Sequence, residues 1–326
     1  MQALKQSRLL LCECPAVPLP VSVIVPVRNE VRNLPRCLES LRAAGEVYVI
    51  DSQSTDESAT IAHSYGAKVV QFEYQGGWPK KRQWAMDTLS FAYDWILLLD
   101  ADETLTPELV QEIRQAVENP SVNGYYIALR MYFLGKVLRH GDASFYKLSL
   151  VRRGKGCFEC RLKAQDASMC DMEVHEHIVV DGPTKKLAHP LIHHNVDSLS
   201  RYIKKHDNYS NWEAGVWLQG ESNHGELPPA LWGTQAQRRR WLKWRFLGIP
   251  GSPVLYFLYK YLFRLGFLDG RPGLIYAGFQ ATQMFHIKAK LFELRQGSRT
   301  ARSTTHPEND STETKVVFET SSQAMR

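Results

Sequence analysis

Two carboxylates one residue apart follow a short apolar run in the first third of the chain. Asp100 and Asp102 come directly after the run Trp95–Leu99, which predicts a buried strand. Because side chains alternate along an extended chain, both carboxylates are expected to point to the same side. Isolated carboxylates there are costly unless they are paired or bind a cation. A hard divalent cation, Mg²⁺ or Mn²⁺, that bridges a carboxylate and a diphosphate would meet this requirement. The alternative is a solvated loop whose acids cap the next helix.

The elements that must position these carboxylates form a repeating strand–helix pattern. Apolar runs predict strands at 21–27, 47–50, 68–72 and 95–99. Between them we expect helices, the first ended by Gly45 and the second started by a capping box at Ser54–Glu57. Successive βα units imply a parallel sheet with helices on both faces. Ligands bind such sheets at the carboxyl ends of the strands, where both Asp51 and Asp100 are expected.

The second half of the chain is less regular. Strands are expected at about 125–133 and 145–152, and helices from Leu199 onwards. Residues after about 297 are rich in Ser, Thr and Glu and are expected to be disordered. The predicted organisation is therefore a lead-in, an α/β domain, a helical region rich in basic and aromatic residues, and a tail, at 1–20, 21–200, 201–297 and 298–326 respectively.

Three strand ends carry motifs in a characteristic order. The first reads Pro26-Val27-Arg28-Asn29-Glu30, the second Asp51-Ser52-Gln53-Ser54-Thr55-Asp56 and the fourth Asp100-Ala101-Asp102. Together they resemble the family 2 glycosyltransferases of the GT-A fold, in which PxxNE, DxxSTD and DxD motifs jointly bind a nucleotide sugar. The resemblance is strong over 21–109 and looser to about 210. It lies close to the bacterial β-glucosyltransferases of lipopolysaccharide core and exopolysaccharide.

The resemblance also implies roles for individual residues. Asp100 should approach the ribose and diphosphate, and Asp102 should ligate the metal, with His194 as a further ligand or else a hydrogen-bonded core histidine. The stretch after Lys80 looks like a variant of the family's KNxA motif, so its cations should neutralise donor phosphate unless they only form a solvated helix face. The complete set of implied donor-binding residues is Pro26, Asn29, Glu30, Asp51, Lys81, Arg82, Asp100 and Ala101. The second motif has Ser52-Gln53 where relatives commonly have a second acid or a glycine.

Inverting transfer also needs a carboxylate base for the acceptor hydroxyl. Glu176 lies in a segment that resembles the family's HE segment, and we expect it to be the base, with His175 or His177 setting its environment. Glu173 and Asp142 are the alternative bases. The two histidines could equally be exposed strand residues at a period of two.

The region 201–302 holds 16 Lys and Arg against 6 Asp and Glu, together with many aromatic residues. No apolar stretch reaches the roughly 20 residues that span a bilayer. Such a composition favours helices that lie on an anionic membrane surface, with a buried helical subdomain as the alternative. We find neither a signal-peptide pattern nor a disulfide framework, and Cys157 and Cys160 lack a second pair for zinc. The expected location is the inner face of the cytoplasmic membrane.

The implied reaction is transfer of a hexose, with UDP-glucose the leading donor, to a saccharide or lipid-linked acceptor of the cell envelope. A nucleotidyltransferase is the competing enzyme class, but it would carry a glycine-rich loop after the first strand, and residues 26–34 contain no glycine. A non-catalytic membrane scaffold is the competing non-enzyme. The first turn lacks GxGxxG, which excludes a nicotinamide site, and no nucleic-acid-binding motif is present.

Overall fold

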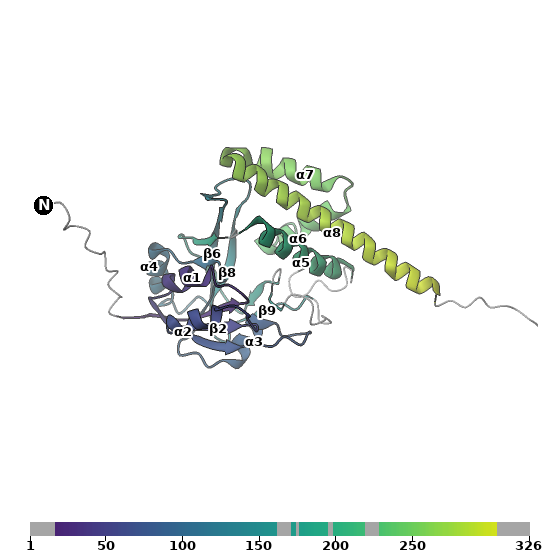
Figure 1. The fold of residues 1–326 in the computed structure, drawn as a ribbon. Helices are drawn as coiled ribbons and strands as arrows, with labels where there is room; N and C mark the ends of the chain where they lie inside the picture. The colour runs from purple at the N-terminus through teal and green to yellow at the C-terminus, as the bar shows by residue number, and fades with distance from the viewer. Residues whose placement is uncertain (1–16, 162–170, 174–175, 195–197, 219–227, 305–326) are drawn as a thin grey trace, which may run out of the picture.

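A mixed sheet forms the centre of the protein, and helices cover both of its faces (Figure 1). The computed structural model describes residues 17–161, 171–173, 176–194, 198–218 and 228–304; His175 and Cys170 lie outside these ranges. Within them, strands hydrogen-bond in the order β3-β2-β1-β4-β8-β6-β12-β5. The mixed α/β sheet followed by a helical region confirms the predicted GT-A class.

The first four strands are parallel, as the sequence predicts. β1 pairs with β2 and β4, and β2 pairs with β3. The apolar residues of β1, β2 and β4 are mostly buried, as a sheet covered by helices on both sides requires, whereas those of the edge strand β3 are partly exposed. Their bounds are Leu19–Val27 (β1), Ala44–Asp51 (β2), Lys68–Gln71 (β3) and Trp95–Leu98 (β4).

Helices pack on opposite faces of this parallel half. Apolar residues of α1 (Leu34–Ser40) and α4 (Pro107–Ala116) join one core cluster, and those of α3 (Lys81–Thr88) join another. α4 begins with Pro107 in its first turn, and the Thr106 hydroxyl accepts a hydrogen bond from the Leu109 N–H.

Two local predictions in this half are wrong. Gly45 does not end α1 but lies inside β2, where the ring of Tyr93 occupies the space that a Cβ would need. Ser54–Glu57 forms no capping box: α2 (Ser58–Ser64) has Glu57 as its N-cap, without a side-chain cap bond. The hydroxyls and carboxylates of 54–58 bond to the loop after β1 instead, because that tertiary contact competes with local capping.

The second half of the sheet brings later residues beside the end of β4. β8 (Ser144–Arg152) runs antiparallel between β4 and β6 (Gly124–Phe133). β12 (Leu191–His194) is parallel to β6 and antiparallel to β5 (Glu103–Thr104), which follows Asp102 directly. The short strands β7 (Lys136–Val137) and β11 (Thr184–Lys186) also pair with β6, whereas β9 (Gly156–Phe158) and β10 (Ile178–Val180) form a separate ribbon.

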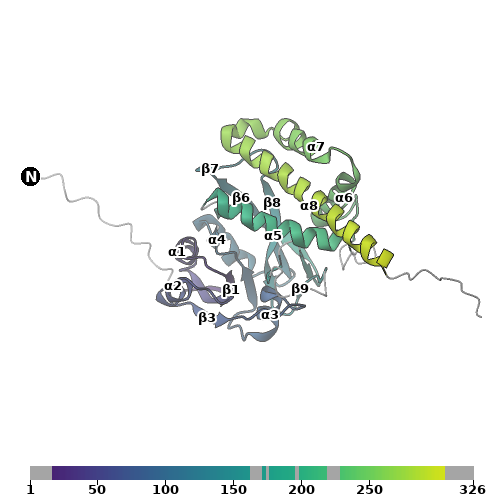
Figure 2. The same cartoon turned by 45° about the vertical axis from the view of Figure 1, so that its right-hand side comes forward.

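Helices make up the rest of the described chain. α5 crosses in front of the sheet, and α7 and the start of α8 lie at the end of the molecule farthest from α2 and α3 (Figures 1 and 2). α8 continues through 298–304, so the predicted tail is wrong for those residues, since a helix that is already nucleated extends at little cost. None of the described helices combines the length and apolarity that a bilayer crossing requires. The bounds are Leu199–Leu218 (α5), Gln235–Gly248 (α6), Ser252–Leu258 (α7), Tyr259–Phe263 (η2, a π-helical turn), Gly266–Asp269 (η3, a 3₁₀ turn) and Gly270–Thr304 (α8).

Buried charges join α5 and α6 to the α/β region. Arg240 of α6 binds the fully buried Glu159 carboxylate through both terminal guanidinium nitrogens. Trp212 of α5 is also buried, and the Lys80 ammonium lies 4.9 Å from its ring centroid. A charge pair of this kind is lost only at a large cost, so these contacts hold the helices firmly on the sheet.

Candidate functional site

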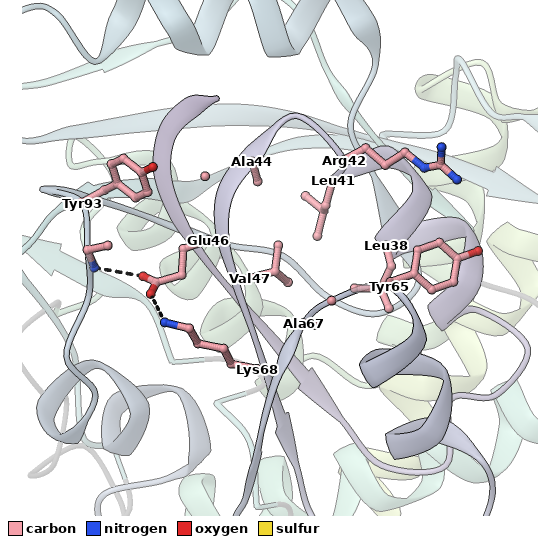
Figure 3. A pocket seen from close by; sticks show the side chains of 13 residues that line it. Leu38, Leu41, Arg42, Ala44, Glu46, Val47, Tyr65, Ala67, Lys68 and Tyr93 are labelled. Carbon is pink, nitrogen blue, oxygen red and sulfur yellow. Dashed lines mark hydrogen bonds and ion pairs between the residues drawn. The ribbon is translucent and has the colours of Figure 1, made fainter. Parts of the chain in front are cut away.

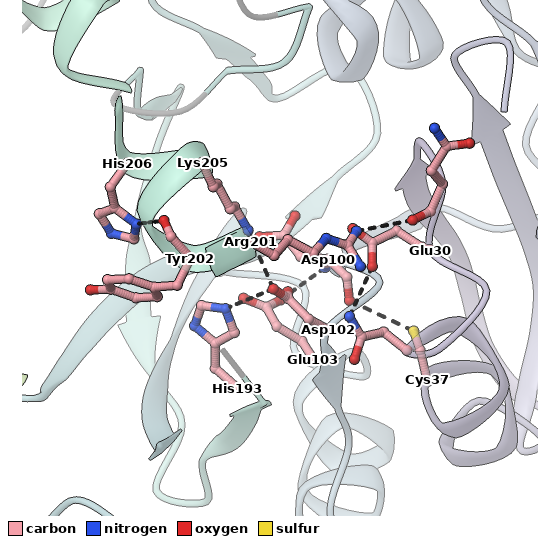
Figure 4. A network of polar contacts seen from close by, with 12 residues as sticks. Glu30, Cys37, Asp100, Asp102, Glu103, His193, Arg201, Tyr202, Lys205 and His206 are labelled. Atoms are coloured by element: carbon pink, nitrogen blue, oxygen red, sulfur yellow. Dashed lines mark hydrogen bonds and ion pairs between the residues drawn. The ribbon is translucent and has the colours of Figure 1, made fainter. Parts of the chain in front are cut away.

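The carboxylates that follow β4 are held by cations from distant parts of the chain (Figure 4). Asp100 contacts the Arg82 guanidinium, and its other oxygen lies 3.0 Å from the Lys147 Nζ. Asp102 Oδ2 lies 3.2 Å from the His193 Nε2 and 3.4 Å from the Lys205 Nζ. The two acids therefore have separate sets of partners, one on each side of the turn.

These partners keep both acids ionised. Burial alone would raise the pKa of Asp100, but Arg82 and Lys147 outweigh it and hold that pKa well below its ordinary value. For Asp102, burial is likewise outweighed, here by Lys205 and His193, and its pKa is also lowered strongly. At the end of β4, two ionised carboxylates are therefore surrounded by positively charged side chains.

The cations at the start of α3 are buried, so the solvated-face alternative is wrong. Lys81 donates to the Val27 carbonyl at 3.0 Å and lies 3.0 Å from the Asp171 carboxylate. The Glu173 carboxylate accepts hydrogen bonds from the backbone N–H groups of Arg82 and Gln83, which is the favourable position for an anion at a helix N-terminus. Glu173 therefore has a structural task that leaves it poorly suited to act as a base.

The first two motifs are bonded to each other. The Asn29 N–H donates to the Ser54 hydroxyl at 2.9 Å, and its side-chain oxygen accepts from the Thr55 N–H at 2.8 Å. Asp51 is buried, with one oxygen accepting from Ser54 and the other from the Gln71 amide. The polar groups of both motifs therefore hold the two loops together.

Glu30 and Pro26 complete the first motif. The Glu30 carboxylate lies 2.6 Å from the Arg201 Nη2, and burial, followed by Asp102, raises its pKa. Pro26 is buried within β1, and Ala101 is buried between the two aspartates. Glu30, Asp100 and Asp102 thus belong to one continuous network.

The histidine beside Asp102 is His193, not the predicted His194. Neighbouring residues of a strand point to opposite faces, so only one of the two rings can face the carboxylate. The ring of His194 instead lies 3.3 Å from the Thr104 hydroxyl. From the sequence, His194 is expected to be either a metal ligand or a hydrogen-bonded core histidine, and its contact with Thr104 agrees with the second expectation.

Glu176 is enclosed rather than exposed. Its carboxylate lies 2.7 Å from the Lys80 Nζ, both side chains are fully buried, and the Lys80 ammonium lies against the Trp212 ring. The other alternative base, Asp142, faces Arg239, Lys260 and Arg264 in a separate cluster. His177 is exposed just before β10.

A hollow of about 350 Å³ lies elsewhere on the sheet (Figure 3). Its walls include Ala44 and Val47 at the start of β2 and Lys68 at the start of β3. These are amino ends of parallel strands, whereas Asp51 and Asp100 lie at the carboxyl ends. This hollow therefore does not serve the acidic strand end.

Sequence reasoning missed several members of the site. None of them belongs to a short motif, and each comes from an element that only the folded topology brings to β4. The alternation of β8 and β12 could have identified the inward-facing members of those strands once the strand pairing was known. The missed residues are Lys147, Asp171, His193, Arg201 and Lys205.

Comparison with known proteins agrees with this architecture. Residues 22–179 match the model of glycosyl transferase family 2. The chain is 28% identical over 287 residues to the lipopolysaccharide core biosynthesis glycosyltransferase LpsC of Rhizobium meliloti, covering 83% of this chain and 94% of that protein. It is 28% identical over 182 residues to 4,4'-diaponeurosporenoate glycosyltransferase of Staphylococcus haemolyticus, covering 52% and 48% of the two chains.

The fold and these matches together define a glycosyltransferase of the GT-A fold. Residues 22–179 form a domain of glycosyltransferase family 2, and the chain is similar over most of its length to a transferase of lipopolysaccharide core biosynthesis.

The contacts between the two loops can be tested at Asn29. Its φ of 56° lies in the left-handed region, which asparagine tolerates well. Asn29→Ala should lower the free energy of unfolding by about 1–2 kcal/mol, because it loses the bond to Thr55 and strains the backbone. Asn29→Gly should recover part of this loss, since glycine relieves the strain alone. Urea titration without ligand measures both, with the exposed Arg28→Ala as control. Equal stability of all three variants and the wild type would contradict the structural role.

Proposed function

We propose that this protein is an inverting hexosyltransferase that moves a sugar, glucose in the first instance, from a UDP-sugar to an acceptor of the cell envelope. The observation that carries the proposal is the charged network at the end of β4 in a family 2 domain. Its position next to the ends of β1 and β2, which carry Glu30 and Asp51, is what a nucleotide-sugar site at a sheet's carboxyl edge requires. The likeness to a lipopolysaccharide core transferase supports a saccharide or lipid-linked acceptor.

A divalent metal, Mg²⁺ or Mn²⁺, fits the residues beside Asp102. Asp102 Oδ2 and His193 Nε2 lie 3.2 Å apart, so both could ligate one ion. Among the described residues no group of three or more His, Cys, Asp or Glu side chains forms a metal cluster. Two protein ligands would leave the remaining positions to diphosphate oxygens and water, as is usual for a metal shared with substrate phosphates. Bound there, the ion would stabilise charge on the departing diphosphate.

The protein's own groups supply the rest of the donor site. The loops at Pro26–Glu30 and Asp51 would hold the nucleoside, and Asp100 would approach the ribose and diphosphate beside Ala101. Lys81 and Arg82 lie at the adjacent α3 terminus and would keep the local potential favourable for a diphosphate. Fixed cations of this kind need no rearrangement when charge develops during the reaction.

Glu176 is proposed as the base that takes the proton of the acceptor hydroxyl. Burial raises its pKa to about 6, although Lys80 opposes the shift, so the carboxylate is a suitably strong base near neutral pH. Because the Glu176 carboxylate is buried against Lys80, this role requires that acceptor binding uncover it.

Calorimetric titration of UDP with and without Mn²⁺ tests the donor site. We expect tight UDP binding only with Mn²⁺, a loss of roughly 10–100-fold in affinity for His193→Ala, and no change for His194→Ala. If only His194→Ala weakens UDP binding, the metal ligand is His194 and not His193. If the wild type binds UDP neither with nor without Mn²⁺, the protein is better described as a non-catalytic membrane scaffold. Turnover of nucleoside triphosphates with release of diphosphate, instead of release of UDP from UDP-hexose, would identify a nucleotidyltransferase.

Glu176→Gln tests the base. Turnover should fall by about 10²–10⁴-fold while UDP binding is kept, because only the proton acceptor is lost. In the wild type, kcat/KM should rise as pH increases through about 6, since the carboxylate acts when deprotonated. Asp142→Asn is the matched comparison. Loss of turnover in that variant, with Glu176→Gln active, would move the role to Asp142.

We also propose that the region 201–297 associates with an anionic membrane at the inner face of the cytoplasmic membrane. Its support is a set of exposed apolar side chains on α7, η2, η3 and the start of α8, among them Phe263, which is 78% exposed. Arg264 and Arg271 are exposed among them, and such a mixture suits an interfacial helix. The other members are Val254, Leu255, Leu262, Leu265, Phe267, Leu268, Leu274 and Ile275.

Flotation with phosphatidylglycerol vesicles at low salt tests membrane association. The wild type should float, and the double variant Leu262→Glu/Phe263→Glu should lose at least about tenfold in partitioning, because burying one large apolar side chain contributes about 1.5–3 kcal/mol. Tyr65→Glu, at the exposed residue that follows α2, is the control. A wild type that stays with the unbound fraction would rule out docking.

A further inference from the structure

The first turns of α5 carry two cations that reach the acidic network. Arg201 and Lys205 are four residues apart and therefore lie on one face of the helix. Arg201 Nη2 lies 2.6 Å from the Glu30 carboxylate and donates to the Asn29 carbonyl at 3.0 Å. Lys205 Nζ lies 3.4 Å from Asp102 Oδ2 (Figure 4). One helix face thus spans the ends of β1 and β4.

The two cations are held differently. Arg201 is fixed by two partners on one loop, which positions the helix over the site. Lys205 has one carboxylate partner, at 3.4 Å, and its ammonium lies 5.9 Å from the Tyr209 ring centroid, with 37% of its side chain exposed. A lysine ammonium on a flexible four-carbon stem can move between neighbouring anions without moving its helix. Lys205 is therefore the mobile member of the pair.

Asp102 cannot keep Lys205 and also bind a metal on the same oxygen. Like charges about 4 Å apart repel by roughly 1 kcal/mol in water and by several times more near a protein surface. A dication repels the ammonium about twice as strongly as a single charge would. When the metal arrives, Lys205 must therefore leave the carboxylate, and the nearest incoming anion is the diphosphate that the metal binds.

We propose that Lys205 is an exchangeable counter-ion, which neutralises Asp102 in the empty enzyme and transfers to the donor β-phosphate when metal and nucleotide bind. The proposal rests on the donor site proposed above. In the reaction the bond from the anomeric carbon to the β-phosphate oxygen breaks and its electron pair stays on that oxygen. The bond to the acceptor oxygen forms, and the acceptor proton goes to the carboxylate base. Lys205 remains protonated and offsets the charge that appears on the β-phosphate.

This exchange has effects of opposite sign on the two ligands. Without nucleotide, Lys205 competes with the metal, so Lys205→Met should bind Mn²⁺ alone about fivefold to tenfold more tightly than the wild type, the effect of one screened charge. With saturating Mn²⁺, the same variant should bind UDP about fivefold to tenfold more weakly. A side chain that only supports the fold would not strengthen one ligand while weakening the other.

The experiment combines Mn²⁺ titration read by electron paramagnetic resonance with calorimetric titration of UDP at saturating Mn²⁺. Lys204→Met removes the same charge from an exposed neighbouring position of α5 and should leave both affinities unchanged. Lys205→Arg keeps the charge and should leave Mn²⁺ binding near that of the wild type. Lys205→Gln replaces the Met variant if the latter fails to fold.

The outcomes separate this inference from the function on which it rests. If the wild type shows no Mn²⁺-dependent UDP binding, both the proposed donor site and the counter-ion exchange are wrong. A wild type that binds normally, with Lys205→Met changing neither affinity or changing both in the same direction, overturns the counter-ion exchange and leaves the donor site intact.

Discussion

Charge compensation at the end of β4 is the constraint on which the rest of the structure depends. Asp102 is buried, Asp100 is half-buried and both are ionised, and breaking a buried pair costs on the order of 3–5 kcal/mol. Their partners come from α3, β8, β12 and α5, elements that span more than a hundred residues of sequence. The strand end can be formed only when all of these elements are in place, so the acidic site and the complete fold require one another.

The parallel half of the sheet could be predicted from sequence because its signals are local. β-branched runs such as Val21–Val27 encode buried strands, and Leu34, Cys37 and Leu38 recur at helical spacing. The position of Asp100 and Asp102 at a strand end followed from the same reading. Where a local signal had a tertiary competitor, as at Ser54–Glu57, the tertiary contact prevailed and the prediction failed.

The residues of the site could be predicted only in part, because local sequence patterns do not show which strands pair with each other across the sheet. The acids are adjacent in sequence, but Lys147, His193 and Lys205 reach them through antiparallel β8, through the register of β12 and through the packing of α5. A one-residue difference in strand parity separated His194 from the residue beside Asp102. The enclosure of Glu176 by Lys80 and Trp212 likewise depends on two segments more than a hundred residues apart.

The bonds between the loop after β1 and the loop after β2 bear on how this protein can change over evolutionary time. Asn29 and Glu30 are satisfied by Ser54, Thr55 and Ser58, so a substitution in one loop strands a polar group in the other. A replacement in one loop is therefore expected to be tolerated best together with a matching replacement in the other, one that keeps the hydrogen bond between them.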